Sequence, residues 1–185
     1  MNFKDAAGII MKEIGSVIKK VEEKEVKNFI SSILDAEKVF VTGAGRVKLM
    51  MQAFAKRLRH LGLESYVVGE TTVPAIGKCD LLIAASGSGE TLTTVDVARL
   101  AKKQKGKLVL ITASPGSTLK RISDLTVRIP CSTKYHLEGE FISRQPMTSL
   151  FEQSLLVFCD GVTMMLKEQL KISEKEMWRI HCNLE

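Results

Sequence analysis

Hydrophobic residues along this chain change their spacing near residue 35. Before that point they recur every three or four positions, at Ile10, Ile14, Val17, Ile18 and Val21 and, after a charged break, at Phe29, Ile30, Ile33 and Leu34. A spacing of three and four residues places side chains on one face of a helix. The pattern predicts that residues 1–35 form helices that pack on the rest of the domain.

Short and nearly continuous apolar runs follow, at residues 39–42, 66–68, 81–85, 108–112 and 125–129. Runs of this kind are typical of strands that are buried on both faces of a parallel sheet. Helical patterns separate several of them, at 49–61 and 91–103, the second with Lys105-Gly106 as its stop. The predicted fold class is α/β, a three-layer sandwich with a five-stranded parallel sheet in flavodoxin-like order.

The C-terminal third is polar from Pro130 to Gln145 and then strongly amphipathic. The periodicity predicts a long helix from Met147 and a shorter one after Ser173, where Glu176 completes a capping box. No repeat or long linker divides the chain. We therefore expect a single domain over residues 1–185, with the C-terminal helices at 147–180 packed on the sheet.

The most informative motif is Ser86-Gly87-Ser88-Gly89-Glu90-Thr91, which joins the third apolar run to a helical pattern. Two glycines permit a sharp turn, three hydroxyls offer hydrogen bonds, and a helix start adds unpaired N–H groups. Such a loop suits a phosphate. An ordinary Gly/Ser loop with Thr91 as a helix cap is the alternative, and the position at the carboxyl end of a strand favours ligand binding.

Two other loops follow predicted strands. Gly43-Ala44-Gly45-Arg46 opens a helix, but Lys48 occupies the place of the third glycine of a dinucleotide fingerprint, which disfavours a Rossmann cofactor site. Glu70 and Thr71 follow the second strand and are expected to face the same crevice, unless Glu70 only caps the next turn.

Two residues of the C-terminal helices are candidates for proton transfer. Glu152 lies in the first turns of a helix whose face is otherwise apolar, where a partly buried carboxylate can act as a general base. An acidic residue that merely favours the helix dipole is the alternative. His181 lies near the C-terminus, where a lone histidine is usually a surface residue.

Composition excludes several function classes. The chain has 185 residues and a net charge of +6, but only 5% are aromatic and no nucleic-acid recognition motif is visible, so a small anionic substrate is the better partner. Four widely spaced cysteines and three histidines make a metal site improbable. No signal-type core or membrane-length apolar run is present, so we expect a cytoplasmic protein with reduced thiols and no membrane partner.

Taken together, five motifs resemble those of the 6-phospho-3-hexuloisomerases of the sugar isomerase (SIS) domain superfamily. They are Gly43-Ala44-Gly45-Arg46, the segment 68–76, the serine-glycine loop 86–91, Pro146-Met147-Thr148-Ser149-Leu150-Phe151-Glu152-Gln153, and the ending His181-Cys182-Asn183-Leu184-Glu185. The serine-glycine loop is shared by all SIS domains. The last two motifs narrow the resemblance to this family, and it runs over nearly the full chain.

The resemblance implies reversible conversion of D-arabino-3-hexulose 6-phosphate to D-fructose 6-phosphate, the second step of the ribulose monophosphate route for formaldehyde. It implies no metal or organic cofactor, and a homotetramer with active sites at subunit interfaces. Glu152 would be the base, and His181 of a neighbouring chain would assist ring opening or proton movement. Ser86, Ser88 and Thr91, with Gly87 and Gly89, would hold the phosphate, and Arg46, Glu70 and Thr71 would line the sugar site.

The chain departs from the family pattern at Val47, where a serine hydroxyl usually meets the phosphate, and Lys48 is a candidate to replace that contact. Losing one hydrogen bond to a charged group costs about 1.5–3 kcal/mol. Thr148-Ser149 also replaces the common Gly-Thr. A non-catalytic SIS module that senses a sugar phosphate therefore remains open, although the first 35 residues are too few for a DNA-binding unit. Another isomerase, acting on arabinose 5-phosphate or sedoheptulose 7-phosphate, is the second alternative.

Overall fold

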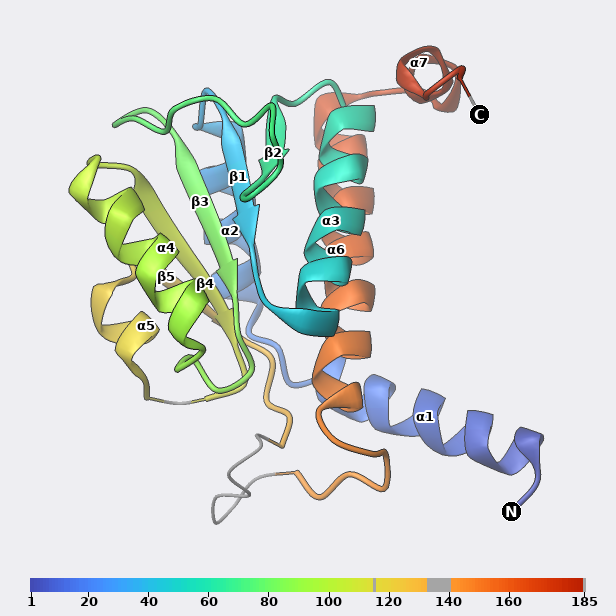
Figure 1. Cartoon of the computed structure of the whole chain (residues 1–185). Helices are drawn as coiled ribbons and strands as arrows, with labels where there is room; N and C mark the ends of the chain where they lie inside the picture. The colour runs from blue at the N-terminus through green and yellow to red at the C-terminus, as the bar shows by residue number, and fades with distance from the viewer. Residues whose placement is uncertain (115, 133–140, 185) are drawn as a thin grey trace.

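A five-stranded parallel sheet forms the centre of the protein (Figure 1). The structure, a computed structural model, describes residues 1–114, 116–132 and 141–184. The strands lie in the order β2-β1-β3-β4-β5, which confirms the flavodoxin-like order. Their bounds are β1 (Val39–Thr42), β2 (Ser65–Val67), β3 (Leu81–Ala85), β4 (Lys107–Thr112) and β5 (Leu125–Arg128).

Helices cover both faces of the sheet and complete the predicted three layers. One layer contains α2 (Glu23–Leu34), α3 (Gly45–His60) and α6 (Ser149–Leu170), and the other contains α4 (Leu92–Lys103) and α5 (Thr118–Ile122). Successive strand residues point to opposite layers. Val39 and Val41 therefore belong to the main core, under α2, α3 and α6, and Phe40 belongs to a second core, under α4 and α5. Because both faces are buried, the strands need continuous apolar runs.

The helices differ from the predicted ones most clearly at α3 and α5. α3 begins at Gly45, four residues before the apolar pattern starts, and α5 was not predicted because five residues are too few to show a helical period. The predicted stop of α4 is confirmed, since Lys105 adopts a left-handed φ of 65° and Gly106 N donates to Ala101 O.

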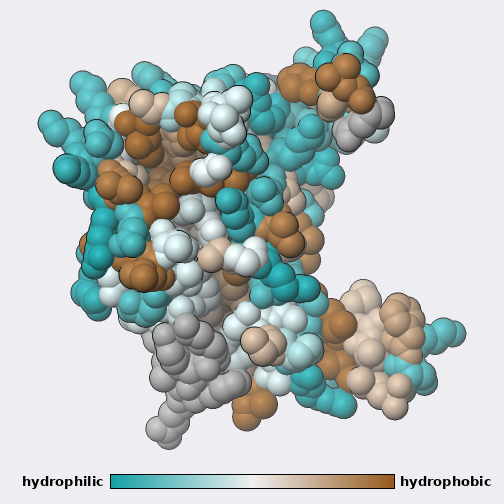
Figure 2. All heavy atoms as spheres, viewed as in Figure 1, coloured by the Kyte–Doolittle hydropathy of each residue, from teal (hydrophilic) through white to brown (hydrophobic). Residues whose placement is uncertain are grey.

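Two helices extend away from the body on the same side of the molecule (Figure 1). They are α1 (Phe3–Ile18), which buries only Glu13 and Val17, and α7 (Glu174–Ile180), which buries no residue. The predicted capping box of Ser173 and Glu176 opens α7. Figure 2 shows apolar atoms on the surface of both projecting helices.

α6 is the central helix of its layer. Among the described residues it alone is long and apolar enough to meet the criteria for a membrane span, but 56% of its most apolar stretch is buried inside the protein. Leu150, Leu155 and Leu166 belong to the main core. The apolar character of α6 is therefore explained by packing within the domain.

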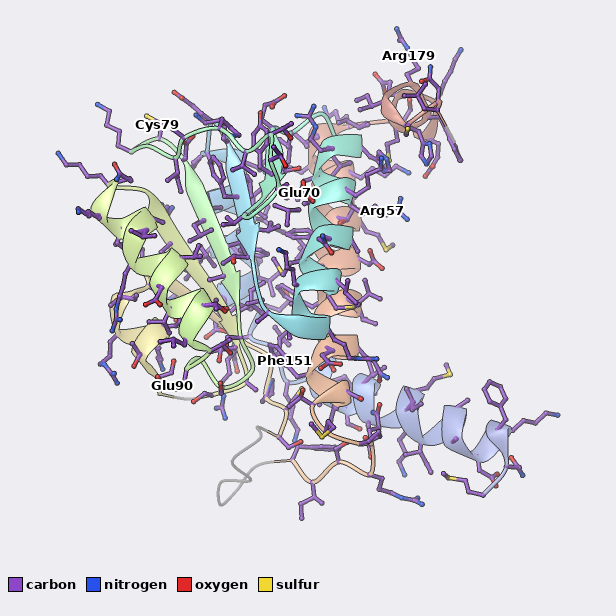
Figure 3. The ribbon with its side chains drawn as sticks, viewed as in Figure 1. Arg57, Glu70, Cys79, Glu90, Phe151 and Arg179 are labelled. Atoms are coloured by element: carbon purple, nitrogen blue, oxygen red, sulfur yellow. The ribbon has the colours of Figure 1, made fainter. Side chains whose placement is uncertain are left out.

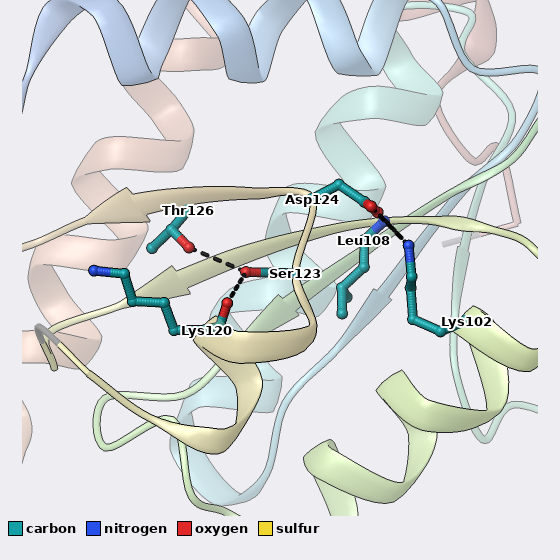
Figure 4. A network of polar contacts seen from close by, with 6 residues as sticks. All are labelled: Lys102, Leu108, Lys120, Ser123, Asp124 and Thr126. Atoms are coloured by element: carbon teal, nitrogen blue, oxygen red, sulfur yellow. Dashed lines mark hydrogen bonds and ion pairs between the residues drawn. The ribbon is translucent and has the colours of Figure 1, made fainter.

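Asp124 joins three elements at the end of the sheet where the strands begin, opposite their carboxyl ends (Figure 4). Its carboxylate accepts hydrogen bonds from Lys102 Nζ at 2.7 and 2.8 Å and from Leu108 N at 2.7 Å. Because these donors come from the end of α4 and the start of β4, one side chain joins both elements to the start of β5.

Candidate active site at the carboxyl ends of β1 and β3

β1 and β3 are neighbouring strands, and the loops that leave them run side by side. Val41 pairs with Ile83 and Thr42 with Ala84, so both strands end at the same level. From here the chain continues to opposite sides of the sheet, to β2 after β1 and to β4 after β3. This is the topological switch point, where open α/β sheets bind ligands.

A cavity of about 340 Å³ opens at this point. The start of α6 and the two residues before it form its third wall. The lining residues are Ala44, Gly45, Arg46 and Val47 after β1, Ala85, Ser86, Gly87, Ser88 and Thr91 at and after the end of β3, and Met147, Thr148, Phe151 and Glu152. The structure thus gathers Arg46, Glu152 and most of the serine-glycine loop around one space.

The hydroxyls of the serine-glycine loop are held by the loop itself. Ser86 Oγ is buried, lies 2.9 Å from Thr91 Oγ1 and accepts a hydrogen bond from Gly89 N at 3.1 Å. Ser88 Oγ accepts from Glu90 N at 3.3 Å. Thr91 is the residue before α4, so the loop leads directly into a helix N-terminus. The shape of the loop is therefore set by its own hydrogen bonds.

The segment after β4 supports this loop through hydrogen bonds and close packing. Ala113 N and Ser114 N both donate to Gly87 O at 3.1 Å. Gly89 has a φ of 67°, and a Cβ there would lie 2.1 Å from Ser117 Oγ, so no larger residue fits.

Glu90 fastens the loop to the start of α5. Thr118 N donates to Glu90 Oε1 at 2.7 Å, and Leu119 N donates to Gly89 O at 3.2 Å. The bond from the Thr118 backbone holds the pKa of the Glu90 carboxyl below its usual value, with help from the Thr118 hydroxyl. Figure 3 shows Glu90 and Phe151 at the same end of the molecule.

Glu152 is buried, with a side chain that is 8% exposed, and its carboxylate has two partners. Thr148 Oγ1 donates to Glu152 Oε1 at 3.0 Å, and Arg46 Nε donates to Glu152 Oε2. The Arg46 side chain is 62% exposed, so the ion pair has one buried and one solvated partner. The carboxylate is held between a hydroxyl of its own helix and a cation from the β1 loop.

Glu70, Thr71 and Lys48 do not line this cavity. Glu70 and Thr71 are exposed on the loop after β2, and Figure 3 shows Glu70 well apart from Phe151. Lys48 extends toward the end of β2, since a Cβ at Gly69 would lie 3.4 Å from Lys48 Nζ. Within one chain, Lys48 does not take the place beside the serine-glycine loop.

His181 lies at the other end of α3. Its ring stacks on His60 with centroids 5.2 Å apart and contacts Trp178 at 5.0 Å. From Arg46 to His60 the helix extends about 20 Å at 1.5 Å per residue. His181 of the same chain is thus far from Glu152. Glu185, the last residue of its motif, lies outside the described residues.

Thr148, Ser117 and Glu13 have contacts in and around the site that the sequence did not indicate. The contact of Thr148 with Glu152 could have been predicted from the sequence, because side chains four residues apart meet on a helix. Ser117 reaches Gly89 only through the packing of α5, and Glu13 reaches residues 143–145 only across the whole fold. No local pattern predicts those contacts.

Neither a cluster of metal ligands nor a reactive buried thiol is found in the part of the chain that the structure describes. No group of three histidine, cysteine or acidic residues there is placed to hold a metal ion. Burial raises the pKa of the Cys131 thiol to about 12, and it raises that of Cys159 as well. A neutral buried thiol is not a nucleophile.

The SIS domain family matches residues 32–157, which span the whole sheet and the beginning of α6. This chain belongs to the SIS domain family. Over 176 residues it is 37% identical to the 3-hexulose-6-phosphate isomerase of Bacillus subtilis, covering 95% of each chain. The enzyme of that name from Mycobacterium gastri is 39% identical, covering 96% of this chain and 88% of the other.

A solved structure from Methanococcus jannaschii has the same fold over nearly its full length. Its TM-score is 0.84 at 33% identity, covering 98% of this chain and 99% of that one, and its inferred function is that of a 3-hexulose-6-phosphate isomerase. Within the SIS domain family, the chain therefore groups with proteins that carry this name.

Proposed function

We propose that this protein is a sugar-phosphate isomerase that interconverts D-arabino-3-hexulose 6-phosphate and D-fructose 6-phosphate. One observation supports it above all: a buried carboxylate and a preorganised anion-binding loop share one cavity. The full-length similarity to 3-hexulose-6-phosphate isomerases favours this substrate over other sugar phosphates. In this role the protein would supply the second step of the ribulose monophosphate route in the cytoplasm.

The phosphate would bind at the serine-glycine loop. Ser86, Ser88 and Thr91 offer hydroxyls there, Gly87 and Gly89 let the backbone approach, and the N-terminus of α4 offers the positive end of its dipole. With the phosphate held at this loop, the carbonyl end of the sugar would lie against the wall formed by the start of α6. That wall carries Glu152.

The isomerisation needs one base and donors for the developing negative charge. Glu152 would take the proton from C2 of the 3-ketose. The electrons of the broken C2–H bond then form the C2–C3 double bond of an enediol, as the carbonyl oxygen on C3 gains a proton. Returning a proton to C3 while the hydroxyl on C2 loses its proton then gives the 2-ketose. Atoms and electrons balance without a cofactor, because the hydrogens only change places.

Arg46 would stabilise the enediolate oxygens. It is paired with Glu152, and because its side chain is 62% exposed it would turn toward the enediolate when the sugar binds. Glu70 and Thr71 remain proposed contacts of the sugar. Since they do not line the cavity of their own chain, they would reach the sugar in the site of a neighbouring subunit.

His181 would come from a neighbouring subunit, since its own chain holds it far from Glu152. Large apolar side chains on the projecting helices support such an assembly, with Phe3 85%, Met11 74% and Trp178 67% exposed. We propose a homotetramer in which α7 of one subunit completes the site of another.

The decisive experiment measures formation of fructose 6-phosphate from 3-hexulose 6-phosphate by the purified protein and by Glu152→Gln. The amide keeps the shape of the side chain and removes the base, so turnover should fall by about 10²–10⁴-fold. Binding of fructose 6-phosphate, measured by calorimetry, should remain. Turnover by Glu152→Gln at the level of the unaltered protein would remove Glu152 from the mechanism.

A non-catalytic sugar-phosphate sensor is the second candidate, favoured by one observation. Val47 lines the cavity with an apolar side chain beside the proposed phosphate site. Binding of fructose 6-phosphate without turnover of 3-hexulose 6-phosphate, arabinose 5-phosphate or sedoheptulose 7-phosphate would support that candidate. Turnover of one of the last two alone would identify a different isomerase.

A further inference from the structure

Glu13 is a buried carboxylate on α1 that serves a segment 130 residues away in the sequence. It is 7% exposed. Its Oε2 accepts hydrogen bonds from Ser143 Oγ at 2.7 Å and Gln145 Nε2 at 3.0 Å, and its Oε1 accepts from Arg144 N at 2.9 Å. Ser143 Oγ in turn accepts from Gln145 N at 3.0 Å. Three consecutive residues are thus held by one side chain.

The charge of Glu13 makes this arrangement specific. Burial opposes ionisation, but the hydrogen bonds from Arg144 N, Gln145 and Ser143 outweigh it and hold the pKa of Glu13 below its usual value. At neutral pH the group is therefore a buried anion. An anion that is buried without donors is strongly unfavourable, so residues 143–145 are restrained to the positions that supply them.

Residues 143–145 lead directly into the turn that opens α6. Met147 in this turn has a left-handed φ of 55°, which a non-glycine residue adopts only when its surroundings impose it. Pro146 O accepts from Ser149 N at 3.2 Å, and Thr148 O accepts from Glu152 N at 3.2 Å. The position of Thr148 thus depends on a strained turn that Glu13 holds from its N-terminal side.

Thr148 then contacts the proposed base. Its hydroxyl donates to Glu152 Oε1 at 3.0 Å, and both Met147 and Thr148 line the cavity. A second contact, from just after the end of α1, restrains the same segment, because Lys20 Nζ lies 5.8 Å from the centre of the Phe141 ring. A continuous series of contacts therefore runs from α1 through residues 141–148 to Glu152.

We propose that Glu13 is a positioning residue for Glu152. It fixes residues 143–145, these fix the turn at 146–148, and the turn sets the orientation of the carboxylate through Thr148. The inference rests on the proposed role of Glu152 as the base. It extends that role to α1, a helix that otherwise projects from the body of the protein.

The test compares Glu13→Gln with Asp124→Asn in the full-length protein. Both substitutions replace a hydrogen-bonded carboxylate by its amide, but Asp124 lies at the opposite edge of the sheet. Glu13→Gln should lower kcat for 3-hexulose 6-phosphate by about 10- to 100-fold, because small misplacements of a catalytic group cost that much. The Kd for fructose 6-phosphate should stay within about twofold, because the serine-glycine loop is untouched. Asp124→Asn should leave kcat unchanged.

A double-substitution cycle and hydrogen exchange separate positioning from general destabilisation. Ser143→Ala removes one donor at a surface segment, and its effect on kcat should not add to that of Glu13→Gln if both act through residues 143–148. Amide exchange at 146–152 should increase in Glu13→Gln and stay unchanged in Asp124→Asn. An unchanged kcat in Glu13→Gln, or fully additive effects, would overturn the proposal.

If the unaltered protein turns over no sugar phosphate, the proposed function fails by itself, and amide exchange at 146–152 decides the role of Glu13. Faster exchange in Glu13→Gln would then support its hold on the turn. Exchange equal to that of the unaltered protein would refute it.

Discussion

Val47 places an apolar side chain in the wall of the cavity. It lines the space beside the serine-glycine loop, and it also packs against the main core. Its Cγ1 lies 3.0 Å from the place where a Cβ on Gly43 would stand, so residues 43 and 47 are closely matched in size. If the loop holds a phosphate as proposed, a methyl group of Val47 stands beside it.

We predict that Val47→Ser tightens the binding of fructose 6-phosphate by up to about 1.5–3 kcal/mol, because it adds a hydroxyl donor for the phosphate. Val47→Ala is the matched control, since it removes the methyl groups without adding a donor. Calorimetry with fructose 6-phosphate and with unphosphorylated fructose measures both. Equal affinities of Val47→Ser and Val47→Ala for the phosphorylated sugar would show that the hydroxyl does not reach the phosphate.

Among the elements, α5 is short but connects the serine-glycine loop to the sheet. Its start holds the loop through Glu90, whose pKa the Thr118 backbone bond lowers from an ordinary value of 4.5. A lowered pKa in the folded state means that the stabilisation is present above about pH 4.5 and is lost as the pH falls through the folded-state value. Glu13, Glu64, Glu174 and Glu176 also have lowered pKa values, so the whole protein should lose stability in that window.

Glu90→Gln should therefore reduce the acid sensitivity of the protein. The variant should have a lower Tm than the unaltered protein at pH 7. The difference should shrink at pH 4, because Glu90 of the unfolded chain is then largely protonated while the folded protein holds its own pKa lower. Thermal unfolding at the two pH values measures it. A difference in Tm that is the same at pH 4 and pH 7 would rule out the Glu90 charge as its cause.

At the opposite edge of the sheet, Asp124 joins α4, β4 and β5 (Figure 4). Asp124→Ala should lower the free energy of unfolding by about 1–3 kcal/mol, because the Leu108 N–H loses its partner beside a buried strand. Asp96→Ala is the control, since it breaks an exposed pair with Arg99 on α4 and should cost less than about 1 kcal/mol. Equilibrium unfolding in urea compares the two. Equal losses would show that the network in Figure 4 contributes no more than a surface ion pair.

For the whole molecule, the arrangement of α1 and α7 bears on how the site is completed. Both project from the same side, and His181 lies at the far end of α3 from Arg46. If neighbouring subunits exchange these helices, each site combines Glu152 of one chain with His181 of another.

Mixing inactive Glu152→Gln with inactive His181→Ala subunits should then restore activity. With equal amounts and full exchange, about a quarter of the sites would contain both intact residues. The assay of fructose 6-phosphate formation follows the recovery, and each variant mixed with itself is the control. No recovery after subunit exchange has been verified by mass would mean that Glu152 and His181 do not cooperate across an interface.

Local patterns in the sequence determined the fold and one wall of the site. Apolar runs and helical spacing predicted all five strands and their order, because burial on both sheet faces leaves a continuous signal in each strand. The serine-glycine loop was also predicted, since its turn residues, hydroxyls and following helix are contiguous. The burial of Glu152 followed from its place on an apolar helix face.

Only the tertiary structure decided which groups meet around that loop. Arg46 and Glu152 are 106 residues apart in the sequence, and Glu13 and Ser143 are 130 apart. Residues so distant share no period or turn, and their contacts arise from the packing of α6 and the segment before it against α1 and α3. The same packing keeps Glu70 and His181 away from the cavity of their own chain, because the position of a loop or a projecting helix is set by what it packs against.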